Sequence, residues 1–289
     1  MKHDLLKNIE SVIDENIVNS RSVSGGCISD SQIITTGSGK KYFLKINFDQ
    51  PPDMFKTESN GLNELRKANA IRIPEVVSVK SHYILLECIE SSSGKSHFFE
   101  DFGRKFAQLH KYKSDRFGFY ENNYIGSTPQ KNIPDKNEET NWVEFYFNKR
   151  ILFQYQLAKK NGYADSTLSL LIKKLEDKIS IILKNSDETP CLLHGDLWGG
   201  NYIVDDSGEA CLIDPAVYFG HREADLAMTK LFGGFSSEFY DAYNEYYPLK
   251  DGYLYRENIY KLYHILNHLN LFGASYYSQT VALLNYYLK

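Results

Sequence analysis

In the first ninety residues, hydrophobic and polar side chains mostly alternate in the way that is typical of β-strands. Four such runs predict strands, at 33–36, 42–46, 75–80 and 83–89. The first two are joined by a Gly-Ser-Gly turn and are expected to form a hairpin. An opening stretch predicts a short amphipathic helix with its apolar face on Leu5, Leu6, Ile9, Val12 and Ile13. A second helix, predicted at 55–68, is inserted among the strands.

The pattern changes after the serine-rich segment 90–94, because the apolar spacing then follows the 3.6-residue period of helices. This period is seen in Phe98, Phe102, Phe106 and Leu109, within 142–159 and 168–183, and from near Arg222 to the end. One short hairpin interrupts the helices, with strands at 202–204 and 210–214. The segment 117–140, rich in Asn, Gly and Pro, predicts a long ordered loop.

These patterns predict an α+β chain of two lobes. Residues 1–90 are expected to form an antiparallel sheet with one inserted helix, and residues 91–289 a larger, mostly helical lobe.

Composition narrows the classes of function. The 289 residues include 33 Lys+Arg and 37 Asp+Glu, a net charge of −4, which disfavours binding to nucleic acid or to a membrane surface. No apolar run approaches the roughly 18 to 20 residues that span a bilayer, and acids interrupt the opening stretch where a secretory signal needs apolar residues. A cytoplasmic protein is expected.

The four cysteines include no C-x-x-C pair, which argues against a disulfide scaffold or a zinc knuckle. Cys88, Cys191 and Cys211 lie in apolar, strand-like contexts and are expected to be buried thiols.

The stretch 193–201, LHGDLWGGN, carries the most informative chemistry. Asp196 and Asn201 lie five residues apart on a loop, and Asp214 ends the second strand of the following hairpin, so two carboxylates and an amide oxygen can converge. Such oxygens suit Mg²⁺. The order also matches the catalytic Asp, the Asn and the metal-binding Asp of protein kinases. We therefore expect phosphoryl transfer, with Asp196 accepting or orienting the substrate proton, Asn201 and Asp214 binding Mg²⁺, and His194 holding the loop.

A kinase also needs groups that cradle and pair phosphates, and the first lobe supplies candidates. Ser24, Gly25 and Gly26 form a small-residue loop whose backbone N–H groups can approach phosphates. Lys45, between apolar neighbours in a predicted strand, can reach the α- and β-phosphates. Glu58, on the next predicted helix, is placed to pair with Lys45.

The segment 85–89 lies at the predicted crossover between lobes, where its backbone, at Glu87 and Ile89, could bind adenine of ATP. Cys27 directly follows Gly26. Positive potential at the glycine loop would favour the thiolate, so redox-sensitive ATP binding is one hypothesis for Cys27 and an inert small side chain is the other.

Several longer strings resemble the fructosamine kinase (ketosamine-3-kinase) family of the protein-kinase-like superfamily. They are HGDLWGGN at 194–201, DPAVY at 214–218, GHREADLAM at 220–228 and LFGGF at 231–235, with shorter matches at 117–119, 123–126 and 128–130. The resemblance covers essentially the whole chain. It implies a bilobal protein-kinase-like fold and transfer of the γ-phosphoryl of ATP to the sugar 3-hydroxyl of ketosamines. The implied partners are small ketosamines or glycated proteins, which the reaction would deglycate.

Two features depart from protein kinases. Asp-Pro-Ala at 214–216 replaces D-F-G, and no A-P-E end follows, so regulation by activation-loop phosphorylation is not expected. Gly199 stands where many relatives have serine, a change in a turn that should not remove catalysis.

The roles of five neighbouring residues stay less defined. Trp198 is either a stacking platform for the substrate or a core side chain. Asp225 is expected to be structural, capping a helix or accepting N–H bonds from the catalytic loop. His221, Arg222 and Glu223 form either substrate contacts or a local ion network.

Three other functions compete with this one. An aminoglycoside- or choline-type kinase would keep the fold and change the substrate. A metal-dependent hydrolase would place His194, Asp196, Asp214 and His221 around a metal, but leaves the Lys–Glu pair unexplained. A non-catalytic nucleotide-binding module would be expected to have lost the lysine or one of the aspartates. The sequence favours no particular ketosugar among fructosyl, ribulosyl and erythrulosyl, and no oligomeric state.

Overall fold

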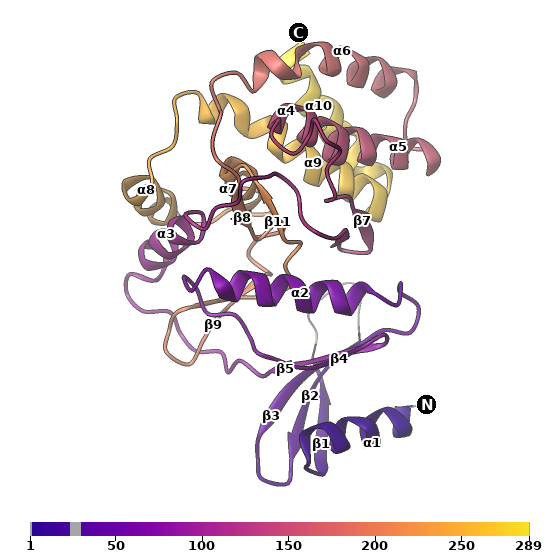
Figure 1. Ribbon diagram of the computed structural model, residues 1–289, viewed down its shortest axis with the longest axis vertical. Helices are drawn as coiled ribbons and strands as arrows, with labels where there is room; N and C mark the ends of the chain where they lie inside the picture. The colour runs from indigo at the N-terminus through magenta and orange to yellow at the C-terminus, as the bar shows by residue number, and fades with distance from the viewer. Residues whose placement is uncertain (1, 24–29, 289) are drawn as a thin grey trace.

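The chain has a sheet-containing part and a helical part arranged along its longest axis (Figure 1). The computed structural model describes residues 2–23 and 30–288. The first part consists of α1 (Lys2–Ile13), β1 (Ile17–Ser22), β2 (Asp30–Thr36), β3 (Lys41–Ile46), α2 (Met54–Lys67), β4 (Val76–Lys80) and β5 (Tyr83–Glu87). The predicted antiparallel sheet with an inserted helix is confirmed.

The five strands pair in the order β1-β2-β3-β5-β4, and all the pairs are antiparallel. The sequence patterns missed β1, because five of its six residues are exposed and it has no alternation of buried and exposed positions. In the register of the sheet, Lys45 on β3 lies opposite Ser31 on β2 and Ile84 on β5. Lys45 thus stands on a central strand, which fixes its backbone on both sides.

The two faces of the sheet are covered by different helices. Tyr42, Leu44 and Ile46 pack with Ile9 of α1 in one hydrophobic cluster. Because successive side chains of a strand point to opposite faces, Lys45 faces the other side, on which Phe55 and two leucines of α2 pack. This alternation directs the lysine toward α2, and α2 crosses between the sheet and the helical part (Figure 1).

The second part is mostly helical, as predicted. It contains α3 (Phe98–Leu109), α4 (Trp142–Tyr146), the π-helix η1 (Phe147–Leu152), α5 (Phe153–Lys160), α6 (Ser166–Ile182), α7 (Arg222–Thr229), α8 (Ser237–Tyr246), α9 (Tyr253–Phe272), the 3-10 helix η2 (Ala274–Tyr276) and α10 (Tyr277–Leu288). The helical periodicity in residues 142–159 corresponds to α4, η1 and α5, and that in residues 168–183 corresponds to α6.

Three short hairpins or strand pairs lie among these helices. They are β6 (Asn123–Ile125) with β7 (Thr128–Gln130), β8 (Cys191–Leu193) with β11 (Tyr218–Gly220), and β9 (Tyr202–Val204) with β10 (Ala210–Leu212). Only the last was predicted, and it ends two residues before Asp214, which therefore does not end the strand. The segment 117–140, predicted as a loop, contains β6 and β7, since strands of three residues are too short to give an alternation signal.

Helices α3 and α8 approach closely at Gly103. A Cβ at Gly103 would lie 2.2 Å from the carbonyl oxygen of Phe239. Replacing a helical glycine with alanine ordinarily stabilises a helix by about 0.5–1 kcal/mol. Here we expect the opposite sign, a loss of about 1–3 kcal/mol, because the helices must separate. Urea unfolding of Gly103→Ala measures this, with Gly61→Ala in α2 as the comparison, where the nearest atom is a Val217 side-chain carbon at 3.2 Å. Equal stability of wild type and Gly103→Ala contradicts the prediction.

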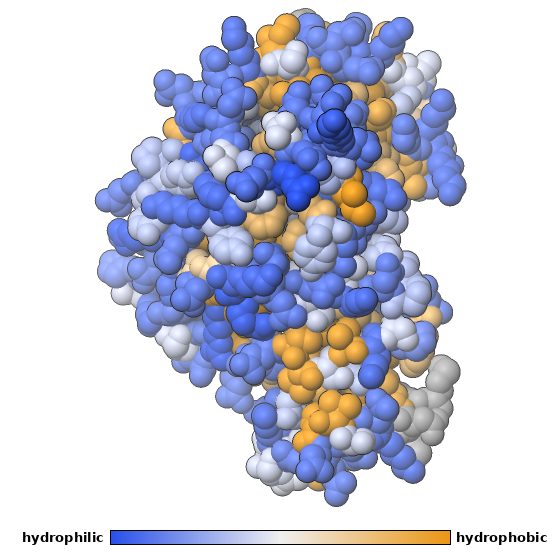
Figure 2. Space-filling model, in the orientation of Figure 1, coloured by the Kyte–Doolittle hydropathy of each residue, from blue (hydrophilic) through white to orange (hydrophobic). Residues whose placement is uncertain are grey.

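The surface seen in Figure 2 is mainly hydrophilic, with a cluster of hydrophobic side chains over the part that contains the sheet. Within residues 2–288, apart from 24–29, no helix has the length and apolar character needed to cross a bilayer. The thiols of Cys191 and Cys211 are buried and that of Cys88 is half-buried, in keeping with their apolar contexts.

Candidate active site

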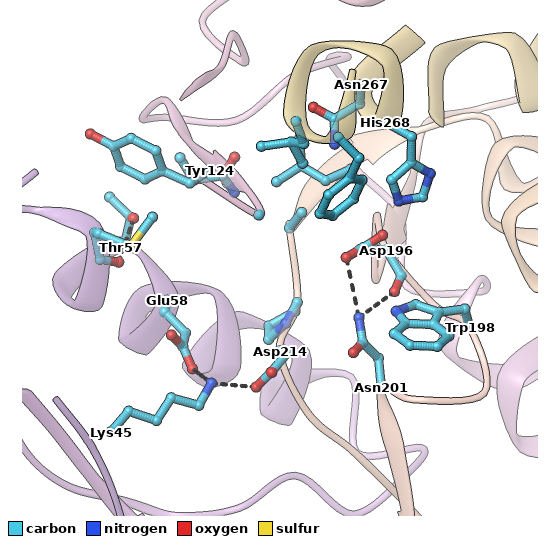
Figure 3. Close-up of a pocket in the computed structure, with 18 of the residues that line it drawn as sticks. Lys45, Thr57, Glu58, Tyr124, Asp196, Trp198, Asn201, Asp214, Asn267 and His268 are labelled. Carbon is cyan, nitrogen blue, oxygen red and sulfur yellow. Dashed lines mark hydrogen bonds and ion pairs between the residues drawn. The ribbon is translucent and has the colours of Figure 1, made fainter. Parts of the chain in front are cut away.

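A cavity of about 390 Å³ lies between the two parts of the chain and collects most of the predicted chemistry (Figure 3). The predicted residues among those that line it are Lys45, Glu58, Asp196, Trp198, Asn201 and Asp214. They come from β3, from α2, from the loop between β8 and β9, and from the chain just after β10. Residues that are up to 169 positions apart in the sequence therefore face one space.

Lys45 joins the sheet to the helical part through two carboxylates. Its Nζ lies 2.7 Å from Oε1 of Glu58 and also contacts Oδ1 of Asp214. Burial lowers the pKa of Lys45, but the charges of Asp214 and Glu58 more than offset this effect and raise its pKa above the ordinary value. Lys45 is therefore a fixed cation, held at the cavity by two carboxylates.

Asp196 and Asn201 are held together within the β8–β9 loop. The side-chain amide nitrogen of Asn201 donates to the carbonyl oxygen of Asp196 at 2.7 Å and to its carboxylate Oδ2 at 3.2 Å. Since that nitrogen is committed to Asp196, the amide oxygen of Asn201 points away from Asp196 (Figure 3). Burial raises the pKa of the Asp196 carboxyl, and the nearby charge of Asp214 raises it further.

His194 holds the catalytic loop against the segment that carries Asp214. Its Nε2 donates to the carbonyl oxygen of Ile213 at 2.9 Å, and its Nδ1 accepts the N–H of Asp196 at 3.3 Å. Burial lowers the pKa of His194, which keeps the ring neutral. Both ring nitrogens are thus occupied by the backbone, and His194 has no free nitrogen with which to act as a base.

The loop that follows β8 lies so close to the backbone at Ala216 that position 195 requires glycine. Its φ of +83° lies in the left-handed region, and a Cβ there would lie 2.0 Å from the carbonyl oxygen of Ala216. The N–H of Ala216 in turn donates to the carbonyl oxygen of His194 at 2.8 Å. Asp214 also has a positive φ, +54°, which is uncommon for a residue with a side chain and is typical of functional sites.

The carboxylate of Asp225, on α7, fixes the backbone of the β8–β9 loop through two hydrogen bonds. Its Oδ2 accepts the N–H of His194 at 2.7 Å, and its Oδ1 accepts the N–H of Gly195 at 2.8 Å. The Nε2 of His110 lies 3.3 Å from Oδ2. The prediction that Asp225 caps the helix is wrong, because His221 occupies that position. The alternative, that Asp225 receives N–H groups of the catalytic loop, matches these contacts.

Removing the Asp225 carboxylate should therefore destabilise the fold and the site together. In Asp225→Ala two buried N–H groups lose their acceptor, and each such loss costs about 1–3 kcal/mol. We expect the free energy of unfolding to fall by roughly 3 kcal/mol, measured by urea denaturation. The control is Asp241→Ala, an exposed aspartate of α8. A variant as stable as this control contradicts the assigned role.

Two buried amides that the sequence analysis did not select also position this region. Asn123 of β6 donates to the carbonyl oxygen of Val217 at 2.8 Å. Gln130 of β7 donates to the carbonyl oxygen of Ala216 and to Oδ1 of Asn123, both at 2.9 Å. The short hairpin thus fixes the backbone just after Asp214. A lone Asn or Gln in a loop gives no sequence signal for this role.

Arg72 ties the tip of the β9–β10 hairpin to the sheet. It forms ion pairs with Asp205 at 2.8 Å, with Asp206 at 2.6 Å and with Glu87 of β5 at 2.7 Å. Asn201 precedes this hairpin and Asp214 follows it. The contacts of Arg72 therefore help to fix both predicted metal ligands relative to the sheet.

Trp198 lies at the cavity and not in the core, since 38% of its surface is exposed. A Cβ at Gly200 would lie 2.5 Å from Cη2 of the indole, so the glycine allows the ring to cover the loop. No atom of the described residues lies within 4 Å of a Cβ at Gly199, so among them the glycine in place of serine at that position has no steric consequence.

Other predicted residues lie elsewhere. Glu87 and Ile89 do not line the cavity, and the N–H of Glu87 donates to the carbonyl oxygen of Glu75 at 2.8 Å. The predicted loop residues Ser24, Gly25, Gly26 and Cys27 lie outside the described residues.

His221, Arg222 and Glu223 form the local network that was one of their two interpretations. Arg222 pairs with Glu188 at 2.8 Å, and Glu223 pairs with Arg256 at 2.6 Å. His221 donates to the carbonyl oxygen of Ser186 at 2.5 Å and caps α7. All three are buried and none lines the cavity.

The whole chain was compared with protein-family models. The model of the fructosamine kinase family matches residues 1–289. The chain belongs to the fructosamine kinase family. Among its relatives, the chloroplastic protein-ribulosamine 3-kinase of Arabidopsis thaliana is 38% identical over 275 residues, which cover 93% of this chain and 82% of that protein. A crystal structure of a candidate fructosamine-3-kinase from Thermobifida fusca superimposes with a TM-score of 0.88 at 28% identity, covering 98% of both chains.

More distant structures share the fold of the fructosamine kinase family. The aminoglycoside phosphotransferase APH(4)-Ia superimposes with a TM-score of 0.63 at 15% identity, covering 99% of each chain. At this identity the likeness extends to the fold alone. The protein-kinase-like architecture expected from the motifs is confirmed.

Proposed function

We propose that this protein transfers the γ-phosphoryl group of ATP to the sugar 3-hydroxyl of ketosamines, the adducts of reducing sugars with amines. The observation that carries the proposal is the single cavity in which Lys45, Glu58 and Asp214 face Asp196 and Asn201. This set lies in a chain that matches the fructosamine kinase family from end to end. Relatives named protein-ribulosamine 3-kinase, such as that of Arabidopsis thaliana, support the acceptor.

ATP is assigned to the Lys45 end of the cavity. Residues 1–90 form the nucleotide-binding lobe in this proposal and residues 91–289 carry the catalytic loop. Lys45, fixed by Glu58, binds the α- and β-phosphates. The role of Ser24, Gly25 and Gly26 in binding phosphate stays a prediction from the sequence, since these residues lie outside the described ones.

Adenine is assigned to the backbone at the crossover between the lobes. We propose that the carbonyl oxygen of Glu87 and the N–H of Ile89 bind the base. The N–H of Glu87 is already used within the sheet, so it is the carbonyl of that residue that remains.

Asn201 and Asp214 fit a Mg²⁺ ion. Both offer oxygen, the donor that this cation prefers, and Mg²⁺ takes only one or two protein ligands alongside phosphates and water. No cluster of three or more His, Cys, Asp or Glu side chains within the described residues could hold a metal, so a site completed by phosphate oxygens suits this donor set. When bound, the cation would neutralise charge on the phosphates.

Asp196 is the proposed catalytic residue. Its carboxylate accepts the proton of the acceptor hydroxyl as the oxygen attacks the γ-phosphorus, and the P–O bond to ADP breaks. The hydrogen bond from Asn201 fixes the carboxylate for this step. Positioning, rather than a strong base, supplies most of the rate in such transfers.

The competing functions fit less well. A hydrolase using His221 is contradicted by the position of that residue, which caps α7 and bonds to Ser186 away from the cavity. A non-catalytic module does not account for the presence of Lys45, Asp196 and Asp214 together at one cavity, with Lys45 paired to Asp214. An aminoglycoside- or choline-type kinase is disfavoured because the fructosamine kinase family model matches the chain over residues 1–289.

The experiment that tests the proposal is ADP formation from ATP and Mg²⁺ with ribulosyl-lysine, fructosyl-lysine, choline and an aminoglycoside. Asp196→Asn serves as the blank. We expect turnover of a ketosamine that disappears in this variant. Turnover of choline or of the aminoglycoside alone contradicts the proposal in favour of the competing kinase.

A further inference from the structure

An aromatic wall closes the end of the cavity opposite Lys45 (Figure 3). It comprises Trp198, Phe232, His268, Phe272 and Tyr276, which come from the β8–β9 loop, the α7–α8 connection, α9 and η2. The rings are in continuous contact: centroids lie 6.2 Å apart for Trp198–Phe232, 4.6 Å for Phe232–His268, 5.2 Å for His268–Phe272 and 5.1 Å for His268–Tyr276. Asp196 stands between this wall and the Lys45 end.

Two phenylalanines of the aromatic wall are partly exposed to solvent, and one of them has a strained backbone conformation. Phe232 is 44% exposed and Phe272 is 50% exposed, although both line the cavity. The φ of Phe232 is +55°, and Gly233 and Gly234 after it also have positive φ. Such a conformation costs a residue with a side chain about 1–3 kcal/mol and persists where the surroundings enforce it, commonly at binding sites. Packing does not explain a strained aromatic residue that stays half exposed, whereas ligand contact does.

The wall also carries no positive charge that would repel a cation. Among the described residues that line the cavity, Lys45 is the one lysine or arginine, and it lies at the other end. Burial lowers the pKa of His268 to about 4, so its ring is neutral near pH 7. Its Nδ1 is buried and has no hydrogen-bond partner within residues 2–23 and 30–288, so the wall presents its aromatic rings to the cavity and no cation.

The chemistry of the acceptor determines what part of it reaches this wall. In a ketosamine the amine is attached to C1, two carbons from C3. When the 3-hydroxyl lies at Asp196 and the phosphates lie toward Lys45, the amine and its substituent extend away from the phosphates. A protonated secondary amine is attracted to the faces of aromatic rings, and its carbon chain gains from apolar contact.

We infer that the aromatic wall of Trp198, Phe232, His268, Phe272 and Tyr276 binds the amine arm of the acceptor and selects ketosamines over free ketoses and neutral derivatives. This inference rests on the proposed function. It assigns the sugar to Asp196 and the protonated nitrogen to the rings, with the substituent of the amine leaving past Phe272 toward solvent. Since Phe272 is half exposed, a peptide or protein attached to that amine can remain outside the cavity.

A matched pair of substrates tests the wall. The first is N-butyl-1-amino-1-deoxyfructose, and the second is the neutral 1-O-butyl ether of fructose, in which oxygen replaces the nitrogen. We expect the wild-type protein to prefer the amine in kcat/KM. Phe272→Leu and Phe232→Leu should raise KM for the amine by roughly 3- to 20-fold, the range that a cation–π contact supports. KM for the ether and KM for ATP should change less than twofold.

The control is Phe48→Leu, a 40% exposed phenylalanine that does not line the cavity. It should leave both KM values unchanged. Two variants are used so that a folding defect in one, detected by thermal unfolding, leaves the other as the test. An equal loss for amine and ether, an unchanged KM for the amine, or a wild-type protein without preference overturns the inference. Absence of turnover of every ketosamine by the wild-type protein would instead overturn the proposed function.

Discussion

Replacing Asp196 with asparagine is expected to lower kcat for a ketosamine by about 10²- to 10⁴-fold, the contribution typical of a positioned proton acceptor. Asparagine has the shape of aspartate but cannot take up the hydroxyl proton. Binding of ATP should persist, because Lys45, Glu58 and Asp214 do not depend on Asp196 for their contacts. The two readouts are single-turnover kinetics and the shift in melting temperature caused by ATP with Mg²⁺.

The control for this variant is Asp241→Asn, which removes an exposed carboxylate of α8. It should match the wild type in both readouts. An Asp196→Asn protein whose kcat stays within tenfold of the wild-type value would falsify the assigned role. Loss of the ATP-induced shift in that variant would instead indicate that the substitution disturbs the nucleotide site.

Acidification is expected to destabilise the fold at a pH well above the range in which carboxylates titrate. Burial lowers the pKa of His264 to about 3 and that of His268 to about 4. Histidines of the unfolded chain titrate near 6.5. As the pH falls below 6.5, the unfolded chain binds protons that the folded chain does not, so the free energy of unfolding decreases. Each such histidine contributes a slope of about 1.4 kcal/mol per pH unit.

Other buried histidines act in the same direction, since burial lowers the pKa of His110, His194 and His221 as well. Their stabilising effect is complete above about pH 6.5 and is lost progressively below it. Carboxylates whose pKa is lowered, such as Glu188, lose their contribution only below the ordinary value for glutamate, about 4.3. A carboxyl whose pKa is raised, such as that of Asp196, acts in the opposite direction, so the contribution of one histidine is obtained by comparing its variant with the wild type.

Urea denaturation at pH values from 7.5 to 5 measures this slope. In His264→Gln the slope between pH 6.5 and 5 should decrease by about 1 kcal/mol per pH unit on average, because the unfolded histidine is only half protonated at pH 6.5. His97→Gln is the control, because the side chain of His97 is 74% exposed. Identical slopes for His264→Gln and the wild type would show that His264 titrates normally in the folded chain.

Local patterns were sufficient to predict the parts of the site that one strand, one helix or one loop carries. Lys45 was recognisable because apolar residues flank it in a strand, and the alternation of the strand directs it toward α2 and Glu58. Asp196 and Asn201 were recognisable from their spacing within one loop. The same locality explains why the inserted helix and four of the five strands of the sheet were predicted.

What the sequence did not predict depends on contacts between distant segments. The strand β1 is exposed along nearly its whole length, so its place in the sheet comes from pairing with β2 and not from its own pattern. Asn123 and Gln130 act through backbone carbonyl groups that lie 94 and 86 residues away. The aromatic wall combines residues of four segments, and single aromatic residues in helices are ordinarily read as core.

The position of the transferred phosphate tests the central claim most directly. The wild-type protein is incubated with ATP, Mg²⁺ and ribulosyl-lysine or fructosyl-lysine, and the product is analysed by two-dimensional ³¹P–¹H NMR. The proposed function predicts a phosphate coupled to the proton on C3 of the sugar, and no such product with Asp196→Asn. A phosphate on any other hydroxyl, or ATP binding without transfer to either ketosamine, would contradict it.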